Sequence, residues 1–364
     1  MKNSFFTTLL FIVGSHFTSV SQCCSAGGGC PIAGGAGMGV LMEKQLELNA
    51  NYQYVSTNKF LNGDQPDVNF LDNYSSKYGY YRLGYGISKN LTLSLESGYY
   101  FDKTQIGLNK RDTISTNGIA DFIIFPRYDV LNKTSNNIHS EITVGAGLKI
   151  PLGNPNDTLK QIEPFSGMVY YILKPPAIRT TTGSQDFIFY LSLIRNYQNQ
   201  NFRIFSNALF IKKGWNALGE KTGNYASVGL FAGKSFFTKL GTTLQLKGEW
   251  IGQMKVNPDL NAYGFIDYNP LATGSKKLLL VPQVSYAFKS FNVFASAEFP
   301  LYQYVNEEQI ASQYFFTTGL SYRFMTASKK EVVSGIYYCP MHPDQTSTKP
   351  ASCPICGMDM ELKK

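Results

Sequence analysis

The chain has 364 residues and a formal net charge of +8 that is spread along its length. Aromatic residues make up 14% of it and charged residues only 16%, where a typical soluble protein has about a quarter charged residues. This balance favours a β-rich protein and argues against nucleic-acid binding, which calls for clustered Lys and Arg.

Residues 1–21 have the layout of a secretory signal peptide. Lys2 supplies a positive start, residues 5–13 are apolar, and small side chains follow as a cleavage site requires. The alternative is a lipoprotein signal, in which Cys23 or Cys24 becomes the lipid-bearing first residue of the mature chain. Either signal predicts export from the cytoplasm, and no later run of apolar residues is long enough for a transmembrane helix.

Residues 22–44 form a leader that is rich in glycine and contains Cys23, Cys24 and Cys30. Such a composition is typical of a flexible segment, and we predict that it lies free in the periplasm. The alternative is that it threads into the domain that follows and plugs it. The three cysteines are candidates for a second soft-metal site, with a disulfide within the leader or a lipid anchor as the alternatives.

Residues 45–325 alternate between apolar and polar side chains with a period of two. Within residues 241–250, one set of alternate positions holds Leu244, Leu246 and Trp250, and the other holds Gln245, Lys247 and Glu249. Because the side chains of a strand point alternately to its two faces, each segment has an apolar face and a polar face. The segments run to roughly 10–15 residues, which suits a tilted membrane strand of about 9–11 residues better than a sandwich strand of about 5–6.

Aromatic residues and link lengths also separate a membrane barrel from a soluble sandwich. Aromatic side chains gather at segment ends, as at 99–101 and 302–304, where a membrane barrel has its interfacial girdles. The links alternate between short ones near 88–90, 132–137, 197–201, 237–241 and 289–291 and long ones over 58–73, 102–114, 154–179, 213–222 and 257–275. We therefore predict an all-β fold, a transmembrane antiparallel β-barrel of about 12 strands over residues 45–325.

The last predicted strand resembles the closing strand of bacterial outer-membrane barrels. Its alternate positions, read back from the end, are Phe324, Tyr322, Leu320, Thr318, Phe316 and Tyr314. The resemblance implies that the assembly machinery reads the terminal aromatic residue. An even number of strands leaves both ends of a barrel on one side, so we predict an outer-membrane location with both termini in the periplasm.

The lumen of a barrel of about twelve strands is intermediate in width. A barrel of eight strands is filled by its side chains, and one of sixteen encloses an open channel. The polar faces of the strands line this lumen, and the candidate charged residues are Glu47, Glu96, Glu141, Lys149, Lys247, Glu249, Glu298 and Arg323. We expect them to keep the lumen polar rather than to mark a specific path.

The segment 337–362 follows a linker over residues 326–336 and contains three of the six cysteines. Cys339 and His342 form a C-x2-H pair, and Cys353 and Cys356 form a C-x2-C pair after ten further residues. Two short pairs on tight turns can close four donors around one ion, and three thiolates with one imidazole suit a tetrahedral zinc site. A disulfide between Cys353 and Cys356 is the alternative, because the periplasm is oxidising.

This stretch resembles the bacterial heavy-metal-binding domain. The pattern is carried by Tyr338-Cys339-Pro340-Met341-His342-Pro343 and by Cys353-Pro354-Ile355-Cys356-Gly357-Met358. The resemblance implies a small zinc-ribbon-like module with a role in metal handling, since such domains are attached to copper and silver efflux proteins. Three further candidate ligands are the soft thioethers of Met341, Met358 and Met360, which suit copper(I) or silver, so zinc is our first expectation and copper(I) or silver the alternative.

These features predict an outer-membrane channel or transport protein with a periplasmic heavy-metal-binding tail, acting in metal homeostasis or efflux. Its expected partners are outer-membrane lipid, heavy-metal ions and periplasmic metal-efflux components. The alternative is a binding or assembly barrel that transports nothing, uses its long loops for docking and holds the metal for structure alone. We do not expect an enzyme, because His139 is the one histidine outside the signal and the metal motif and has no triad arrangement around it.

Overall fold

The computed structural model describes most of the chain after the leader, in two compact units, Met1–Phe324 and Met325–Lys364. The described residues are 39–68, 71–110, 113–162, 166–237, 239–259, 269–288, 290–326, 336–339, 344–348 and 360–362. Among them, no helix is long and apolar enough to cross a membrane.

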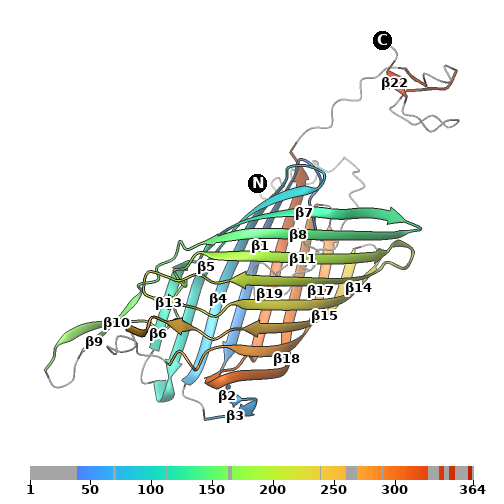
Figure 1. The fold of residues 1–364 in the computed structure, drawn as a ribbon. Helices are drawn as coiled ribbons and strands as arrows, with labels where there is room; N and C mark the ends of the chain where they lie inside the picture. Colours follow the sequence, from blue (N-terminus) through green and yellow to red (C-terminus); the bar gives the residue numbers. More distant parts are fainter. Residues whose placement is uncertain are drawn as a thin grey trace, which may run out of the picture. The chain divides into compact units, whose positions relative to one another are not determined.

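The first unit is a closed antiparallel barrel (Figure 1). Its ring consists of twelve strands, namely β1 (Gln45–Thr57), β4 (Leu71–Gly86), β5 (Leu91–Gly107), β7 (Phe122–Ser135), β8 (Ile138–Ile150), β11 (Asp186–Tyr197), β12 (Phe202–Lys212), β14 (Tyr225–Phe236), β15 (Leu240–Ile251), β17 (Ser275–Phe288), β18 (Phe291–Ile310) and β19 (Tyr314–Met325). Each strand pairs with its neighbours in chain order, and β19 returns to β1. The predicted barrel of about twelve strands is confirmed.

The two ends of the barrel differ in the length of their connections. The short-turn end has links over 87–90, 136–137, 198–201, 237–239 and 289–290, and β1 begins and β19 ends there. In the β7–β8 turn, Asn136 and Asn137 both have positive φ, 49° and 61°, a conformation that asparagine tolerates and that matches the twist of a tight hairpin. A connection that is only two residues long thus joins two long strands.

The long-loop end carries most of the remaining small elements. They are β2 (Phe60–Gly63), β3 (Gln65–Pro66), η3 (Leu108–Lys110), β6 (Thr113–Ile119), β9 (Thr158–Ile162), β10 (Val169–Leu173), β13 (Glu220–Lys221) and β16 (Lys255–Val256); η4 (Gln198–Gln200) lies in a short turn. The prediction of a long link over 102–114 is wrong in part, because β5 continues to Gly107 and pairs there with β6. This extension is polar on both faces and therefore shows no alternation.

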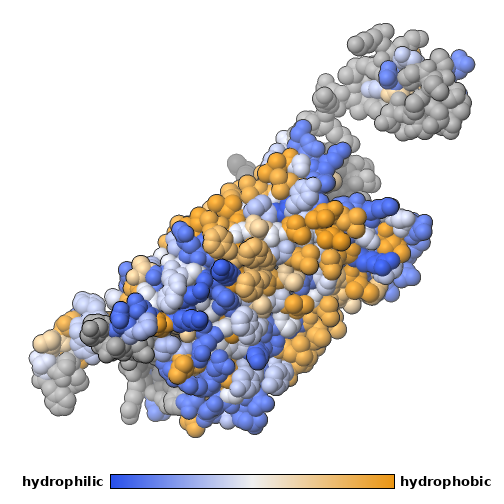
Figure 2. Space-filling view, viewed as in Figure 1, coloured by the Kyte–Doolittle hydropathy of each residue, from blue (hydrophilic) through white to orange (hydrophobic). Residues whose placement is uncertain are grey.

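The barrel wall is inverted relative to a soluble protein. On β15, the inward Thr243, Gln245 and Lys247 are buried, whereas the outward Leu244 and Leu246 are 50% and 39% exposed. Figure 2 shows apolar residues gathered in a broad band over the wall, with hydrophilic residues towards the long-loop end. A polar interior behind an apolar exterior is the arrangement of a barrel that faces lipid.

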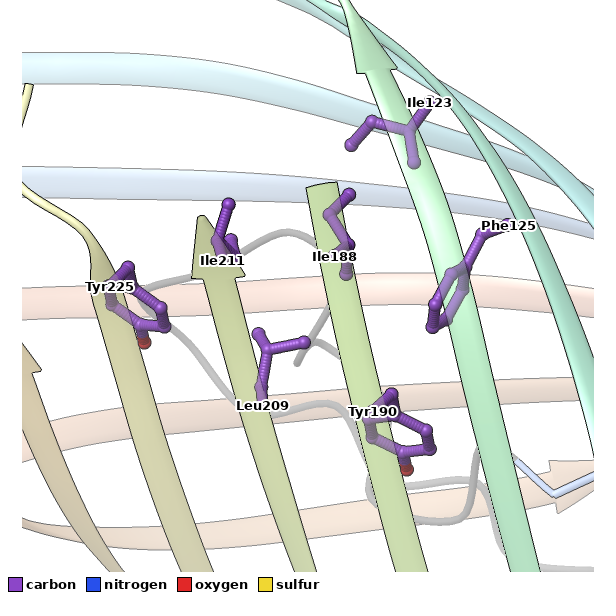
Figure 3. Close-up of a cluster of buried hydrophobic side chains, with 7 residues drawn as sticks. All are labelled: Ile123, Phe125, Ile188, Tyr190, Leu209, Ile211 and Tyr225. Carbon is purple, nitrogen blue, oxygen red and sulfur yellow. The ribbon is translucent and has the colours of Figure 1, made fainter. Parts of the chain in front are cut away.

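One side of the interior is apolar. Inward side chains from β7 and, beyond β8, from the neighbouring strands β11, β12 and β14 pack into one cluster (Figure 3): Ile123, Phe125, Ile188, Tyr190, Leu209, Ile211 and Tyr225. The rings of Phe125 and Tyr190 meet edge to face, with centroids 6.0 Å apart. Two members of the cluster contact charged side chains of the lumen: the hydroxyl of Tyr225 donates to Glu249, and the guanidinium of Arg127 lies 6.0 Å from the ring centroid of Phe125.

The second unit contains a small three-stranded antiparallel sheet. Its central strand β20 (Tyr337–Tyr338) pairs with β21 (Thr346–Ser347) on one side and with β22 (Glu361–Leu362) on the other. Two-residue strands have little stability of their own, so this unit needs another source of cohesion.

Candidate functional site

A buried thiol lies at one end of the sheet in the second unit. Cys339 follows β20 directly, and its side chain is fully buried. Its backbone N–H donates to the carbonyl oxygen of Gln345 at 3.2 Å, which ties the start of the β20–β21 connection to its end. The backbone of Cys339 is thus fixed by the pairing of β20 with β21 and by its own hydrogen bond to Gln345.

The register brings the second connection of this unit to the same end of the sheet. Tyr338 pairs with Thr346 on β21 and also with Glu361 on β22. The chain therefore re-enters the sheet through Met360, next to the end from which Cys339 leaves.

Most of the other predicted ligands lie outside the described part of the chain. His342, Cys353, Cys356, Met341 and Met358 lie outside the described residues, as do Cys23, Cys24 and Cys30 of the leader. In the described part of the chain, no three His, Cys, Asp or Glu side chains are grouped to hold a metal ion. The donor set itself fits a metal: three thiolates and an imidazole suit zinc or a softer ion, and a buried thiol beside a sheet this small is where such an ion would supply cohesion.

The lumen forms a second candidate site, and its short-turn half contains a cluster of buried ion pairs. Glu47 on β1 accepts a hydrogen bond from Arg82 on β4 at 2.7 Å and another from Arg323 on β19. Next to them, the hydroxyl of Tyr80 donates to Glu96. Buried charges require such partners, because an uncompensated charge in a low-dielectric interior is costly.

The described end of the leader enters this half of the lumen. Arg127 on β7 donates to the carbonyl oxygen of Gly39 at 3.0 Å, and the backbone N–H of Leu41 donates to the hydroxyl of Thr92 at 2.7 Å. A side chain at position 39 would collide with the carboxylate of Glu141. The prediction that the leader lies free is therefore wrong for residues 39–41, which lie in the lumen as the plug alternative required; residues 22–38 lie outside the described residues.

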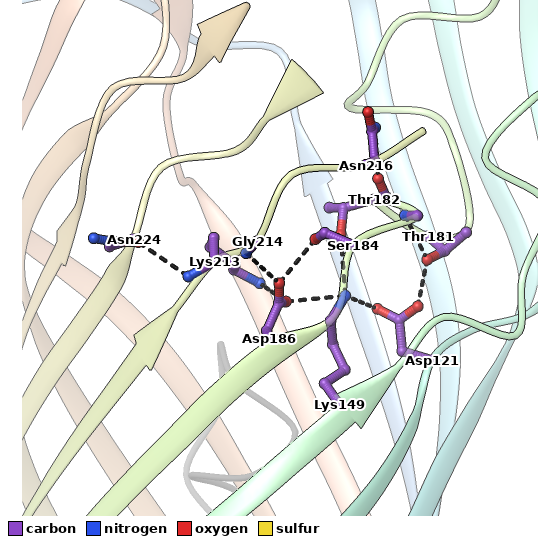
Figure 4. A network of polar contacts seen from close by, with 11 residues as sticks. Asp121, Lys149, Thr181, Thr182, Ser184, Asp186, Lys213, Gly214, Asn216 and Asn224 are labelled. Carbon is purple, nitrogen blue, oxygen red and sulfur yellow. Dashed lines mark hydrogen bonds and ion pairs between the residues drawn. The ribbon is translucent and has the colours of Figure 1, made fainter. Parts of the chain in front are cut away.

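A network of charged side chains fills the long-loop end of the lumen (Figure 4). The ammonium of Lys149 lies 2.7 Å from Asp121 and 3.0 Å from Asp186, and Lys213 lies 2.9 Å from the same oxygen of Asp186. Ser184 also donates to Asp186, at 2.8 Å. Asp186 is fully buried and begins β11, so the network fixes the point where the long β8–β11 connection rejoins the barrel.

The end of that connection folds over the inner side of the mouth. We call residues 174–185 the mouth loop. Within it, Ile178 is fully buried, and Arg179 makes a two-pronged contact with Glu220 of the β12–β14 link, at 2.6 and 3.1 Å. Lys103 on β5 donates to the carbonyl oxygen of Arg179 at 2.8 Å. The mouth loop is thereby pinned between β5 and the β12–β14 link, narrowing the long-loop mouth.

A third group of inward charges lies on the other side of the barrel. Lys247 lies 3.3 Å from Glu249 and 3.5 Å from Glu298, and Lys277 lies 3.6 Å from Glu249. The hydroxyl of Tyr225 donates to Glu249 at 2.9 Å. The lumen therefore carries paired charges of both signs at several levels, an interior suited to polar contents.

Comparison with known proteins identifies the second unit. Its sequence matches the family model of the heavy metal binding domain over residues 336–363. This unit is a heavy metal binding domain. The same region is 47% identical over 34 residues to the silver exporting P-type ATPase of Salmonella typhimurium, a match that covers 9% of this chain and only 4% of that protein.

The barrel resembles solved outer-membrane proteins in fold. The COG4313 outer membrane channel from Pseudomonas putida F1 matches with a TM-score of 0.58 and 11% identity, over 79% of this chain and 98% of that one. The β domain of the Bordetella autotransporter BrkA matches less well, with a TM-score of 0.42 and 11% identity over 78% of this chain and 100% of that one. The chain thus joins an outer-membrane β-barrel fold to a heavy metal binding domain.

All eight charged residues predicted for the lumen lie on inward faces and contact a partner. Sequence reasoning missed Arg82 and Arg127, although both occupy inward positions of the same alternation and could have been found from it. It also missed Arg179 and Glu220, which lie in irregular connections where no periodic pattern shows which way a side chain points.

Proposed function

We propose that the protein is an outer-membrane channel that presents a metal-binding domain to the periplasm and acts in metal homeostasis or efflux. The observation that carries this proposal is the combination, on one chain, of a closed barrel with a charged lumen and a heavy metal binding domain. A barrel alone would fit many solutes, and a metal-binding domain alone would fit a soluble carrier. Together they favour a protein that handles metal at the outer membrane.

We infer the orientation of the barrel from the lengths of the connections at its two ends. Outer-membrane barrels have short turns on the periplasmic side and longer loops outside the cell. Because β1 begins and β19 ends at the short-turn end, we place both termini, and with them the heavy metal binding domain, in the periplasm. Periplasmic components of metal efflux are the partners that this position would allow it to meet.

The predicted ligands of the metal-binding domain and its likeness to a silver exporter favour different metal ions. Three thiolates and one imidazole suit zinc, whereas Met341, Met358 and Met360, together with the likeness to a silver exporter, favour copper(I) or silver. We propose zinc as the resident ion, with copper(I) or silver as the alternative. Metal analysis of the full chain after loading with each ion in turn, compared with Cys353→Ser and Cys356→Ser variants, decides between them.

Passage through the barrel would require the two segments in its lumen to move. The mouth loop narrows the long-loop mouth, and residues 39–41 lie in the short-turn half of the lumen. We propose that the described arrangement is the closed state of the channel. Entry of small polar solutes into liposomes tests this function, and entry no faster than into protein-free liposomes, for the full chain and for a Glu220→Gln variant that releases the mouth loop, would contradict it.

A binding barrel without transport is the second candidate, and a specific feature favours it. The β9–β10 hairpin exposes Met168, Val169, Tyr170 and Tyr171, and its base is pinned by Lys174, which lies 2.7 Å from Asp157. Partial burial raises the pKa of Asp157, but the hydrogen bonds from Lys174 and Thr116 outweigh this and hold that pKa below its usual value. The carboxylate therefore stays charged at neutral pH and keeps the hairpin in place for docking.

The two candidates differ in the liposome experiment. A channel admits solute in proportion to the amount of protein, whereas a docking barrel binds its partner and leaves the liposome closed. We propose no catalytic role for the chain. His139 lies 3.0 Å from the hydroxyl of Thr134 and 3.6 Å from Glu141, contacts that hold it at the start of β8.

A further inference from the structure

The lipid-facing wall of the barrel contains a hollow of about 600 Å³ on β14, β15, β17 and β18. Its floor consists of outward side chains that are unusually small for this wall, and we call it the alanine groove: Ala232, Thr242, Pro282, Ala295 and Ala297. Phe202, Leu244, Val284 and Phe316 stand around it. The groove opens to the outside of the barrel, since these larger residues lie on outward positions.

The strand register explains why the hollow runs across the strands. Ala232 pairs with Leu244 and Leu244 with Pro282, which gives one row of outward positions. The adjacent row, towards the short-turn end, runs from Lys234 through Thr242 and Val284 to Ala295. The rows on either side are bulky, with Leu230, Leu246, Leu280 and Phe299 on one side and Phe236, Leu240, Tyr286 and Val293 on the other. These two rows contain the small residues Ala232, Thr242, Pro282 and Ala295, with Leu244 and Val284 standing between them, and they lie between two rows of large residues, so that the groove is a trough.

Pro282 contributes to the depth of the trough. It lies in the middle of β17, where a proline supplies no amide N–H to the ladder. Regular pairs between β17 and β18 occur on both sides of it, Leu280 with Phe299 and Gln283 with Ser296, but not at Pro282 itself. The small side chain of Ala297 lies across from this point on β18, so no bulky group fills the space.

The position of the groove determines what can occupy it. It lies in the apolar band of the wall, which faces lipid in an outer-membrane barrel, so its occupant must be an apolar chain. Lys234 lines its short-turn side, and the ammonium lies 5.6 Å from the ring centroid of Phe236, the last residue of β14. Among the described residues, no carboxylate pairs with Lys234. A lysine at the edge of an apolar surface extends its ammonium to the polar headgroup level.

We propose that the alanine groove is a binding site for one phospholipid, with an acyl chain in the trough and the lipid phosphate on Lys234. The two halves of the site match the two halves of the ligand: an apolar trough below the interface and a single cation at it. The barrel itself requires neither the trough nor the lysine. Larger apolar side chains in the groove would pack against lipid equally well, and a neutral glutamine could stand at position 234.

The test is titration of the purified full chain with phosphatidylglycerol, followed by native mass spectrometry to count bound lipid. Ala297→Phe fills the trough, and Lys234→Gln removes the charge. The matched controls are Ala226→Phe and Lys276→Gln. Ala226 faces outward on the same strand as Ala232 but near the long-loop end, and Lys276 lies over the ring of Tyr304 at that end. We expect about tenfold weaker retention of the first lipid in each groove variant and no change in the controls. Ala297→Phe removes the contact of about two methylene groups, which is enough for that factor, and Lys234→Gln removes the charge-assisted hydrogen bond to the phosphate.

Other outcomes overturn the proposal. If Ala297→Phe retains the first lipid as the parent chain does, the trough holds no acyl chain. If a neutral diacylglycerol binds as tightly as phosphatidylglycerol and Lys234→Gln changes neither, the site does not recognise phosphate. The barrel fold of each variant is checked by circular dichroism before the titration, and all four positions face outward, where substitution leaves the lumen untouched.

Discussion

The contact between Arg179 and Glu220 holds the mouth loop in the long-loop mouth, and its removal should open the channel. Both side chains are almost fully buried, at 3% and 4% exposure. Glu220→Gln leaves the Arg179 guanidinium buried without its carboxylate, which costs about 3–5 kcal/mol. This cost falls on the closed state, because Arg179 regains water when the loop leaves the mouth.

The size of the effect follows from that free energy. Since 1.4 kcal/mol corresponds to a factor of ten in an equilibrium constant, a cost of about 3 kcal/mol lowers the ratio of closed to open mouths by roughly 100-fold. Single-channel recording in planar bilayers should show the Glu220→Gln variant open for a much larger share of the time than the parent chain.

The control for this experiment removes a carboxylate of the same chemistry from an exposed ion pair. Asp102 lies 3.6 Å from Lys77, and their side chains are 34% and 47% exposed. Exposed pairs contribute about 0–1 kcal/mol, so Asp102→Asn should leave the open share unchanged. If Glu220→Gln recorded the same open share as the parent, the mouth loop would not be the closure that we describe.

Three further predictions address the plug, the stability of the barrel and the metal. Gly39→Val should displace the leader from Glu141 and raise the conductance in planar bilayers, whereas Val40→Leu should not; equal conductance in the two variants would count against a lumen plug. Arg82→Ala leaves the buried Glu47 with Arg323 as its one remaining hydrogen-bonded arginine and should lower the free energy of unfolding by about 1–3 kcal/mol in a urea titration; a loss below about 0.5 kcal/mol would contradict this. Chelation of the metal should remove the dispersed amide signals of residues 337–362, because a bound ion supplies the folding free energy of so small a domain; signals that persist in the chelated sample would show that it folds without metal.

The strands and the lumen could be predicted because a single physical rule governs both. A barrel wall separates lipid from a polar interior, so every membrane-spanning strand shows the alternation that gave Glu47 and Lys247 an inward position. This rule no longer applies beyond the edge of the apolar band. Beyond it both faces of a strand are polar, and for this reason the sequence did not show that β5 extends to Gly107.

The closures of the lumen could not be predicted, because they depend on contacts between distant segments. Arg179 and Glu220 are 41 residues apart, and Leu41 and Thr92 are 51 residues apart. No local pattern marks such pairs, and a glycine-rich leader has the same composition whether it is free or threaded. The metal motif is the opposite case, since its ligands stand close together in the sequence and their spacing is itself the signal.

The central claim is that the chain forms a solute-permeable barrel in the outer membrane. The most direct test is the rate at which small polar solutes enter liposomes containing the purified full-length chain. We predict entry that rises in proportion to the amount of protein and rises further with Glu220→Gln. Entry at the rate of protein-free liposomes, for the parent and the variant alike, would contradict the account.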